Sequence, residues 1–330
     1  MHISGFRPRL AALLTAIVVS VGLLGLSSLS AWAASGTITE FPVPGSAPSV
    51  ITAGPDGNLW FTEFNAGKIG RITPSGTITA FPIPTASSSP FGITAGPDGN
   101  LWFTESGTGK IGRITTTGVI TEFSPPTQSS VPTGITAGPD GNLWFTEVVG
   151  NAIGRITPSG TISEFRIKTT NSQPVAITAG PDGNLWFTEE LGNQVGRITT
   201  AGRITEFPAG SDPRGITAGP DGNLWFALLG VNAIGRITPA GVLTTFRFPS
   251  RCGKYGDCEP WGITAGPDGT RWFTLSAGNA IGRITPAGLF TSGFGIPTAN
   301  SRPEGITVGP DGNVWFTEEL AGKIGRISTS

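Results

Sequence analysis

Residues 51–63 read ITAGPDGNLWFTE, and this segment recurs along the chain. Its opening letters, ITAGPDG, begin again at Ile93, Ile135, Ile177, Ile216 and Ile263, and a variant with Val308 begins at Ile306. The spacings between successive starts are 42, 42, 42, 39, 47 and 43 residues. A period near forty residues is typical of one four-stranded blade of a β-propeller. The sequence therefore predicts an all-β fold, a seven-bladed β-propeller.

Each repeat contains four segments that read as strands. In the first repeat we expect an inner strand over Ile-Thr-Ala, followed by strands over residues 58–62, 69–73 and 77–81. The Pro-Asp-Gly and Pro-Ser-Gly triplets between them are turn signals, because proline presets φ and glycine tolerates positive φ. Leu59 and Phe61 alternate with Trp60, so both faces of the sheet are apolar. Neighbouring blades of a propeller cover both faces.

The last repeat lacks the outer strand, and an extra copy of it precedes the first repeat. The outer strand follows the third strand in the first six repeats, but the last repeat stops at Ile327-Ser328. An extra copy of it, Gly36-Thr37-Ile38-Thr39-Glu40-Phe41, stands at the start of the chain. We therefore predict that residues 36–42 pair with the last blade. This pairing closes the ring and removes the exposed strand edges of an open array.

The first 33 residues have the pattern of a secretory signal peptide. Arg7 and Arg9 precede an apolar run over residues 10–26, and Ala31-Trp32-Ala33 has the form of a cleavage site. An uncleaved membrane anchor is the alternative, but the run is short and interrupted by polar residues. We expect residues 1–33 to be removed, residues 34–330 to form the propeller, and the protein to be secreted or extracytoplasmic.

Composition limits the partners of the mature chain. Removing Arg7 and Arg9 leaves 19 basic residues against 22 acidic ones, a net charge of −3. Without a basic patch, nucleic acid and anionic membrane surfaces are poor partners. We expect a monomer that binds a small molecule or peptide at the central mouth of the ring.

The two cysteines lie close together, at Cys252 and Cys258. In an exported protein such a pair is most simply a local disulfide, and we predict that bridge. A reactive thiol or a metal site is the alternative, but the mature chain has no histidine, since the single histidine is His2.

Residues that recur in every repeat belong to the scaffold, so a functional site should lie where the repeat breaks. The residue after the proline that opens each inner strand differs in every repeat. It reads Ser49, Phe91, Thr133, Val175, Arg214, Trp261 and Glu304. Inner strands line the channel of a propeller, so we predict that these side chains ring one mouth and bind the ligand. Simple drift at a loop end is the alternative.

A second break lies at the end of the second strand. Five repeats carry glutamate there, whereas the fifth and sixth carry Leu228 and Leu275. The longest loop, residues 248–260, enters the sixth repeat and contains Glu259. Apolar groups with a few charges are the usual composition of a small-molecule pocket, so we add both leucines to the predicted ligand site.

Three recurring strings, Trp-Phe-Thr-Glu, Lys-Ile-Gly-Arg-Ile-Thr and Gly-Thr-Ile-Thr-Glu-Phe-Pro, resemble the virginiamycin B lyase (streptogramin lyase) family over the whole mature chain. The resemblance implies a seven-bladed propeller that linearises type B streptogramin antibiotics by elimination, with Mg²⁺ at the central mouth. It also implies antibiotic resistance as the role. The family's two key histidines stand in the Pro-x-Gly/Ala-Ile position of the last two blades. The matching residues here are Trp261 and Glu304, and neither is an imidazole.

Three functions remain open. The first is a secreted binding protein without lyase activity. The second is a Mg²⁺-dependent carbon–oxygen lyase that uses carboxylates, with Glu304 or Glu259 as the catalytic base. The third is a lactonase-like hydrolase, which would need a cluster of metal ligands that the mouth residues do not supply. The sequence identifies no metal ligands.

Overall fold

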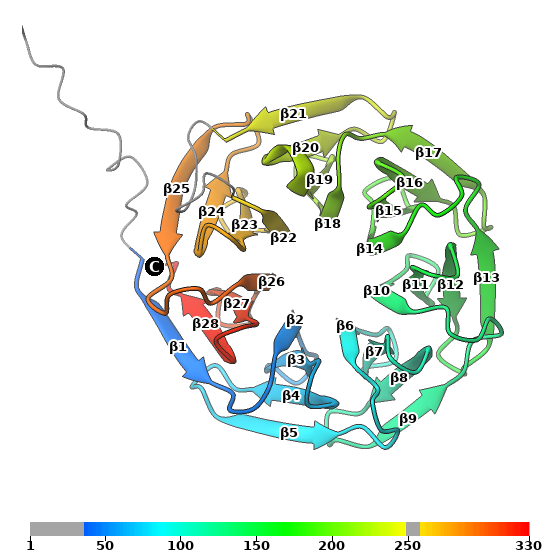
Figure 1. The fold of residues 1–330 in the computed structure, drawn as a ribbon, viewed down its shortest axis with the longest axis horizontal. Helices are drawn as coiled ribbons and strands as arrows, with labels where there is room; N and C mark the ends of the chain where they lie inside the picture. The colour runs from blue at the N-terminus through cyan, green and yellow to red at the C-terminus, as the bar shows by residue number, and fades with distance from the viewer. Residues whose placement is uncertain (1–35, 249–257, 330) are drawn as a thin grey trace, which may run out of the picture. The chain divides into compact units, whose positions relative to one another are not determined.

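The described part of this computed structural model, residues 36–248 and 258–329, forms seven four-stranded antiparallel sheets around a central channel (Figure 1). The prediction of a seven-bladed β-propeller is confirmed. Residues 1–33, with the predicted signal peptide, lie outside the described residues, so that prediction stands untested. No helix among the described residues is long and apolar enough to cross a membrane.

The strands of each blade follow one another from the channel outward. The innermost strands are β2 (Pro48–Ala53), β6 (Pro90–Ala95), β10 (Pro132–Ala137), β14 (Pro174–Ala179), β18 (Pro213–Ala218), β22 (Pro260–Ala265) and β26 (Pro303–Val308). The second strands are β3 (Leu59–Glu63), β7 (Leu101–Glu105), β11 (Leu143–Glu147), β15 (Leu185–Glu189), β19 (Leu224–Leu228), β23 (Arg271–Leu275) and β27 (Val314–Glu318).

The two outer positions complete each sheet, and a short 3-10 turn, η1 (Leu229–Val231), follows β19. The third strands are β4 (Lys68–Ile72), β8 (Lys110–Ile114), β12 (Ala152–Ile156), β16 (Gln194–Ile198), β20 (Ala233–Ile237), β24 (Ala280–Ile284) and β28 (Lys323–Ile327). The outermost strands are β1 (Ile38–Pro42), β5 (Ile78–Pro82), β9 (Ile120–Phe123), β13 (Ile162–Arg166), β17 (Ile204–Pro208), β21 (Leu243–Arg247) and β25 (Phe290–Gly295).

Strand β1 closes the ring, as the count of outer strands predicts. It pairs antiparallel with β28 from Ile38 opposite Ile327 to Pro42 opposite Lys323. The last sheet therefore has the order β1-β28-β27-β26 and joins the two ends of the propeller domain (Figure 1). The Lys323 ammonium lies 2.9 Å from the Glu40 carboxylate, which adds an ion pair to the backbone ladder.

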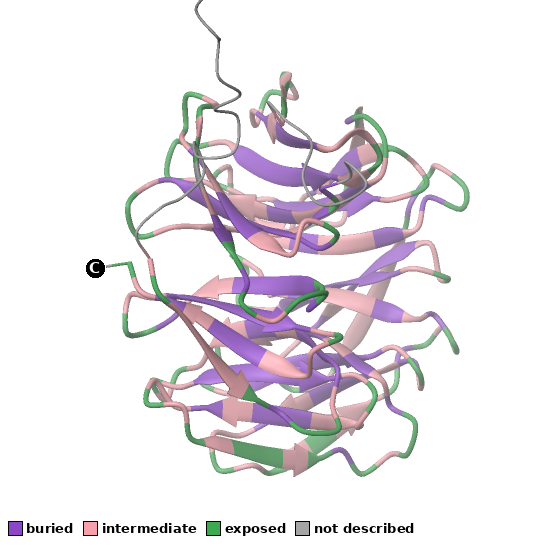
Figure 2. Cartoon of the chain, turned by 60° about the vertical axis from the view of Figure 1, so that its left-hand side comes forward, coloured by how far each residue is buried: buried purple, intermediate pink, exposed green. Residues whose placement is uncertain are grey.

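The hydrophobic core lies between the blades. Leu59 and Phe61 of the first blade pack with Trp315 of the last one, and Trp60 packs with Leu101 of the second. All five side chains are buried. Burial is concentrated on the strands, whereas the turns are exposed (Figure 2). Each tryptophan of the second strand therefore fills the space between two blades, as expected of a residue that recurs in every repeat.

A recurrent polar contact set holds six of the seven tryptophans of the second strands; the indole N–H of the seventh, Trp272, has no hydrogen-bond partner among the described residues. In the first blade the Trp60 indole N–H donates to Asp56 Oδ1 at 2.9 Å, and Phe81 stacks on the indole. The Arg71 guanidinium lies 5.6 Å from the Trp60 ring and donates to the carbonyl of Thr116 in the next blade. The repeated arginines and aspartates are therefore structural, since they tie one blade to the next.

The predicted disulfide can be followed at one end only. Cys258 is buried among Trp225, Phe273 and Leu275, whereas Cys252 lies outside the described residues. The Cys252–Cys258 bridge therefore remains a prediction. Mass spectrometry of the purified protein, alkylated without reductant, would test it, since two alkylated thiols would contradict it.

Candidate functional site

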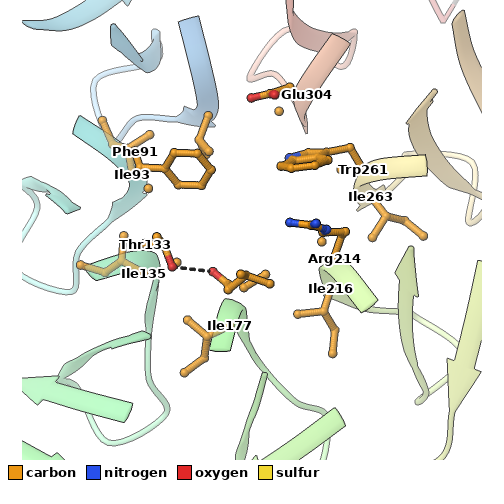
Figure 3. Close-up of a pocket in the computed structure, with 18 of the residues that line it drawn as sticks. Phe91, Ile93, Thr133, Ile135, Ile177, Arg214, Ile216, Trp261, Ile263 and Glu304 are labelled. Carbon is orange, nitrogen blue, oxygen red and sulfur yellow. Dashed lines mark hydrogen bonds between the residues drawn. The ribbon is translucent and has the colours of Figure 1, made fainter. Parts of the chain in front are cut away.

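The inner strands enclose a central cavity of about 430 Å³. Its wall contains one isoleucine from each of six inner strands: Ile93, Ile135, Ile177, Ile216, Ile263 and Ile306. Phe91 and Trp261 point toward each other from opposite sides (Figure 3). Drug-sized ligands are bound in cavities of 300–1,000 Å³ with mainly apolar walls and a few polar groups. The size and lining of this cavity therefore suit a small hydrophobic molecule.

Buried threonines in the second strands hold the inner strands in place. Thr104 accepts a hydrogen bond from the Gly92 N–H at 2.8 Å and donates to the carbonyl of Thr133, in the next blade, at 2.7 Å. Four other threonines also donate to an inner-strand carbonyl of the next blade: Thr62, Thr146, Thr274 and Thr317. In the fifth blade this residue is Ala227, so the hydroxyl bridge toward Trp261 is missing there.

A charged cluster lies on one side of the cavity. The Arg214 guanidinium donates to both Glu190 oxygens, at 2.8 and 2.6 Å, and its Nε lies 2.8 Å from Asp212 Oδ1. The same guanidinium lies 4.5 Å from the centre of the Trp261 ring. All three guanidinium nitrogens thus face carboxylates, and the cation also contacts an aromatic face. Arg214 is therefore held in one position and has little capacity left for a ligand anion.

Glu304 is the second acidic group of the cavity wall. Its side chain is only 6% exposed, and its carboxyl lies 3.5 Å from Arg302 Nε. Burial and the nearby Glu319 carboxylate raise the pKa of Glu304 to about 7, against the opposing effect of the Arg302 and Arg214 charges. At neutral pH this carboxyl can therefore either accept or release a proton.

Most of the variable inner-strand residues meet at this cavity, as predicted. Those that line it are Phe91, Thr133, Val175, Arg214, Trp261 and Glu304. Ser49 does not belong to the wall: it is buried, and its carbonyl accepts a hydrogen bond from Thr317. Its neighbour Val50 lines the cavity instead, at a position that is glycine in five other blades.

The other predicted site residues lie elsewhere. Leu228 and Leu275 are buried in the hydrophobic clusters of the fifth and sixth blades and do not line the cavity. Glu259 is exposed and also lies outside the cavity wall. Its left-handed backbone (φ 47°) and its N–H bond to Asn232 are features of a turn. Among the predicted acids, Glu304 alone reaches the cavity.

One lining group was missed by the sequence reading. Glu190 follows the buried Glu189 at the end of β15, and its carboxylate reaches Arg214 on the next blade. The fourth and seventh repeats have Glu-Glu at this point, where the others have a single acid or none. The second glutamate is a break in the repeat that could have pointed to Glu190. The repeat pattern alone, however, does not show which of the two glutamates faces the channel.

The glutamates at the ends of the second strands form a separate feature. Five of them are buried: Glu63, Glu105, Glu147, Glu189 and Glu318. Burial and the Glu206 carboxylate of the outer strand together raise the pKa of Glu189 to about 8. Outer-strand acids act in the same sense at Glu105, Glu147 and Glu318. None of the five lines the cavity, so they are groups of the scaffold.

The sequence pattern of the virginiamycin B lyase family matches residues 24–210 and 208–330. The chain belongs to the virginiamycin B lyase family. A structure of streptogramin B lyase covers 89% of the chain and 97% of its own length at 40% identity, with a TM-score of 0.83. The structure of virginiamycin B lyase from Staphylococcus aureus is also 40% identical to this chain, with a TM-score of 0.83; the match covers 89% of this chain and 100% of that one.

Other family comparisons add detail. A catalytically inactive virginiamycin B lyase from Staphylococcus aureus, in which a histidine is replaced by alanine, has been solved with quinupristin; its TM-score is 0.84 at 40% identity. The curated virginiamycin B lyase of Saccharopolyspora erythraea is 52% identical over 40 residues, which is 12% of this chain and only 13% of that relative. Hydrazine synthase from Kuenenia stuttgartiensis, at 15% identity and a TM-score of 0.70, shares the fold.

The cavity wall of this virginiamycin B lyase family member does not fit a resident Mg²⁺. Magnesium prefers six oxygen ligands in near-octahedral geometry. Of the two carboxylates in the wall, Glu190 already binds Arg214 through both oxygens, which leaves Glu304 alone. Residues 36–248 and 258–329 contain no group of three or more acidic, histidine or cysteine side chains that could hold a metal.

Proposed function

We propose that the protein is a secreted binding protein of the virginiamycin B lyase family. It holds a hydrophobic small molecule or peptide in the central cavity and does not linearise streptogramins. The observation that carries this proposal is the pair Trp261 and Glu304. These residues occupy the positions that the family resemblance assigns to catalytic histidines, and both line the cavity.

The chemistry of elimination explains why this substitution matters. A base must remove a proton beside a carbonyl, the carbon–oxygen bond of the ester then breaks, and the departing carboxylate needs a proton or a cation. An indole at position 261 can do neither step. Losing a general acid or base typically costs about 10²–10⁴-fold in rate. The apolar wall and the aromatic pair Phe91 and Trp261 still supply contact area for a ligand.

A lyase that uses carboxylates is the second candidate. One observation favours it: Glu304 reaches the cavity, and burial raises its pKa to about 7, which suits a general base. The acid partner and the metal of such an enzyme are not supplied by the described cavity wall. We therefore rank this function below ligand binding.

One experiment separates the two functions. The purified mature protein is incubated with quinupristin, with and without Mg²⁺, next to the Staphylococcus aureus enzyme. Elimination leaves the mass of the ring unchanged, so opening is followed by chromatographic retention, and binding by calorimetry. We expect turnover at least about 100-fold below that of the enzyme. Efficient opening that is abolished by Glu304→Gln would establish the carboxylate lyase instead.

A further inference from the structure

Acidic side chains outnumber basic ones around the cavity. Three lining residues carry a charge, namely Glu190, Arg214 and Glu304. Asp212 and Glu319 stand behind them, and so does Arg302. This makes four acids against two bases, a net charge of −2 when all are ionised. The walls that enclose these groups are mostly apolar, so their charges are less screened than charges on an open surface.

Both arginines of this group already bind carboxylates. Arg214 binds Glu190 through two nitrogens and faces Asp212 with the third. Arg302 is 44% exposed, and its Nη1 lies 3.0 Å from Glu319 Oε2. An anionic ligand would have to displace one of these carboxylates, so the cavity has no ready cation for it.

Glu304 is the charged group of the cavity wall with the weakest contacts to opposite charge. Its carboxyl accepts no hydrogen bond from the described residues, and its ion-pair contact with Arg302 is long, at 3.5 Å. A buried carboxylate of this kind gains most from a cationic hydrogen-bond donor, since charge-assisted hydrogen bonds are the strong ones. The Trp261 ring lies between Arg214 and Glu304 in the view of Figure 3. Indole rings attract cations to their faces.

We propose that the ligand of this cavity is a hydrophobic amine, whose ammonium group binds Glu304 beside the Trp261 ring while its apolar body lies against the isoleucine wall. This inference rests on the proposed binding function and adds the chemical class of the ligand. The position that the resemblance assigns to a histidine becomes, in this chain, the anchor for a cation.

Three probes of similar size and different charge test this assignment: 2-naphthylmethylamine, 2-naphthylmethanol and 2-naphthoate. Each is titrated into the mature protein by calorimetry at about pH 8, where Glu304 is mostly ionised. We expect the amine to bind at least about tenfold more tightly than the alcohol, and the carboxylate to bind more weakly than both.

Variants connect the preference to one side chain. Glu304→Gln should weaken amine binding at least about tenfold and leave alcohol binding within about twofold. Glu259→Gln, which removes an exposed acid outside the cavity wall, is the matched control and should change neither. Thermal unfolding of each variant shows that it is folded.

The outcomes distinguish this inference from the function on which it rests. Binding of the alcohol with no preference for the amine, or an amine affinity unchanged in Glu304→Gln, would overturn the amine assignment and leave the binding cavity intact. If none of the three probes binds, the proposed binding function fails, and the amine assignment fails with it.

Discussion

Phe41 stacks on Trp315, with 5.5 Å between the ring centroids and 18° between the ring planes. Phe81 and Trp60 make the same contact with the same values inside the first blade. The difference is that Phe41 belongs to β1, which lies at the start of the domain's sequence, whereas Trp315 lies near its end. The seventh blade is therefore equal to the others in its packing, but it depends on a strand from the far end of the chain.

Removing residues 34–44 should therefore destabilise the whole ring. The seventh blade loses its outer strand, the Phe41 stack and the Glu40–Lys323 ion pair. We expect the melting temperature to fall by more than about 10 °C. A chain that begins at Gly36 is the control and should melt with the full mature protein. A deletion variant within a degree or two of it would refute the role of β1 as the closing strand.

Stability should decrease as the pH rises from about 5 to 8. Unfolded glutamates ionise near pH 4.5, whereas burial moves the pKa of Glu105, Glu147 and Glu318 to about 7 and that of Glu189 to about 8. Between these values the folded state binds more protons than the unfolded state. The stabilisation is therefore complete below about pH 4.5 and is lost as the pH rises through 7–8.

We expect the melting temperature to be lower by about 5 °C or more at pH 8 than at pH 5. Glu189→Gln removes one ionisation opposite Glu206 and should raise the melting temperature at pH 8 while leaving it nearly unchanged at pH 5. Glu259→Gln, at an exposed acid, should keep the pH slope of the natural chain. A flat profile between these pH values would contradict the assignment.

The threonine bridges can be tested by an isosteric change. Thr104→Val keeps the shape of the side chain but leaves the Gly92 N–H and the Thr133 carbonyl without the hydroxyl. We expect a loss of about 2 kcal/mol or more in the free energy of unfolding. Thr79→Val, on the exposed side of an outer strand, should change it by less than about 0.5 kcal/mol. Equal effects of the two variants in denaturant titrations would argue against the bridge.

Introducing imidazoles tests our proposal that the protein lacks lyase activity because positions 261 and 304 are not histidines. Trp261→His combined with Glu304→His places histidines at both positions that the family resemblance assigns to them. We expect the double variant to open quinupristin faster than the natural chain, because an acid–base pair is available again. The single variants are the controls and should gain little. If the double variant binds quinupristin without any gain in rate, the cavity lacks more than the two imidazoles.

The repeat alone was sufficient to predict the ring. A four-strand unit that is apolar on both faces cannot bury itself, so seven copies must pack against one another. The displaced outer strand of residues 36–42 then determined the closure, since the last repeat lacks an outer strand of its own and the extra copy stands at the start of the chain. The variable residue after each inner-strand proline was predicted to reach the channel, and Phe91, Arg214, Trp261 and Glu304 do so.

Other features depend on contacts between blades, which the repeat pattern does not specify. Val50 rather than Ser49 reaches the cavity, and Leu228 fills a hydrophobic cluster instead of a ligand site. Arg271 replaces an apolar residue, yet it is buried, with Nη2 2.6 Å from Asp221 Oδ1 of the preceding blade. Each of these positions is set by where a neighbouring blade places its side chains.

The number of blades, the strand order within each blade, the closing strand and the absence of histidine from positions 261 and 304 were all predictable from the residues alone. These follow from periodicity and residue identity, which can be read along the chain without any distance in space. Only the folded ring shows that Glu190 neutralises Arg214 and that Glu304 has just one long ion-pair contact. The charge balance of a cavity depends on distances between side chains from different blades, and these distances exist only after the ring has closed.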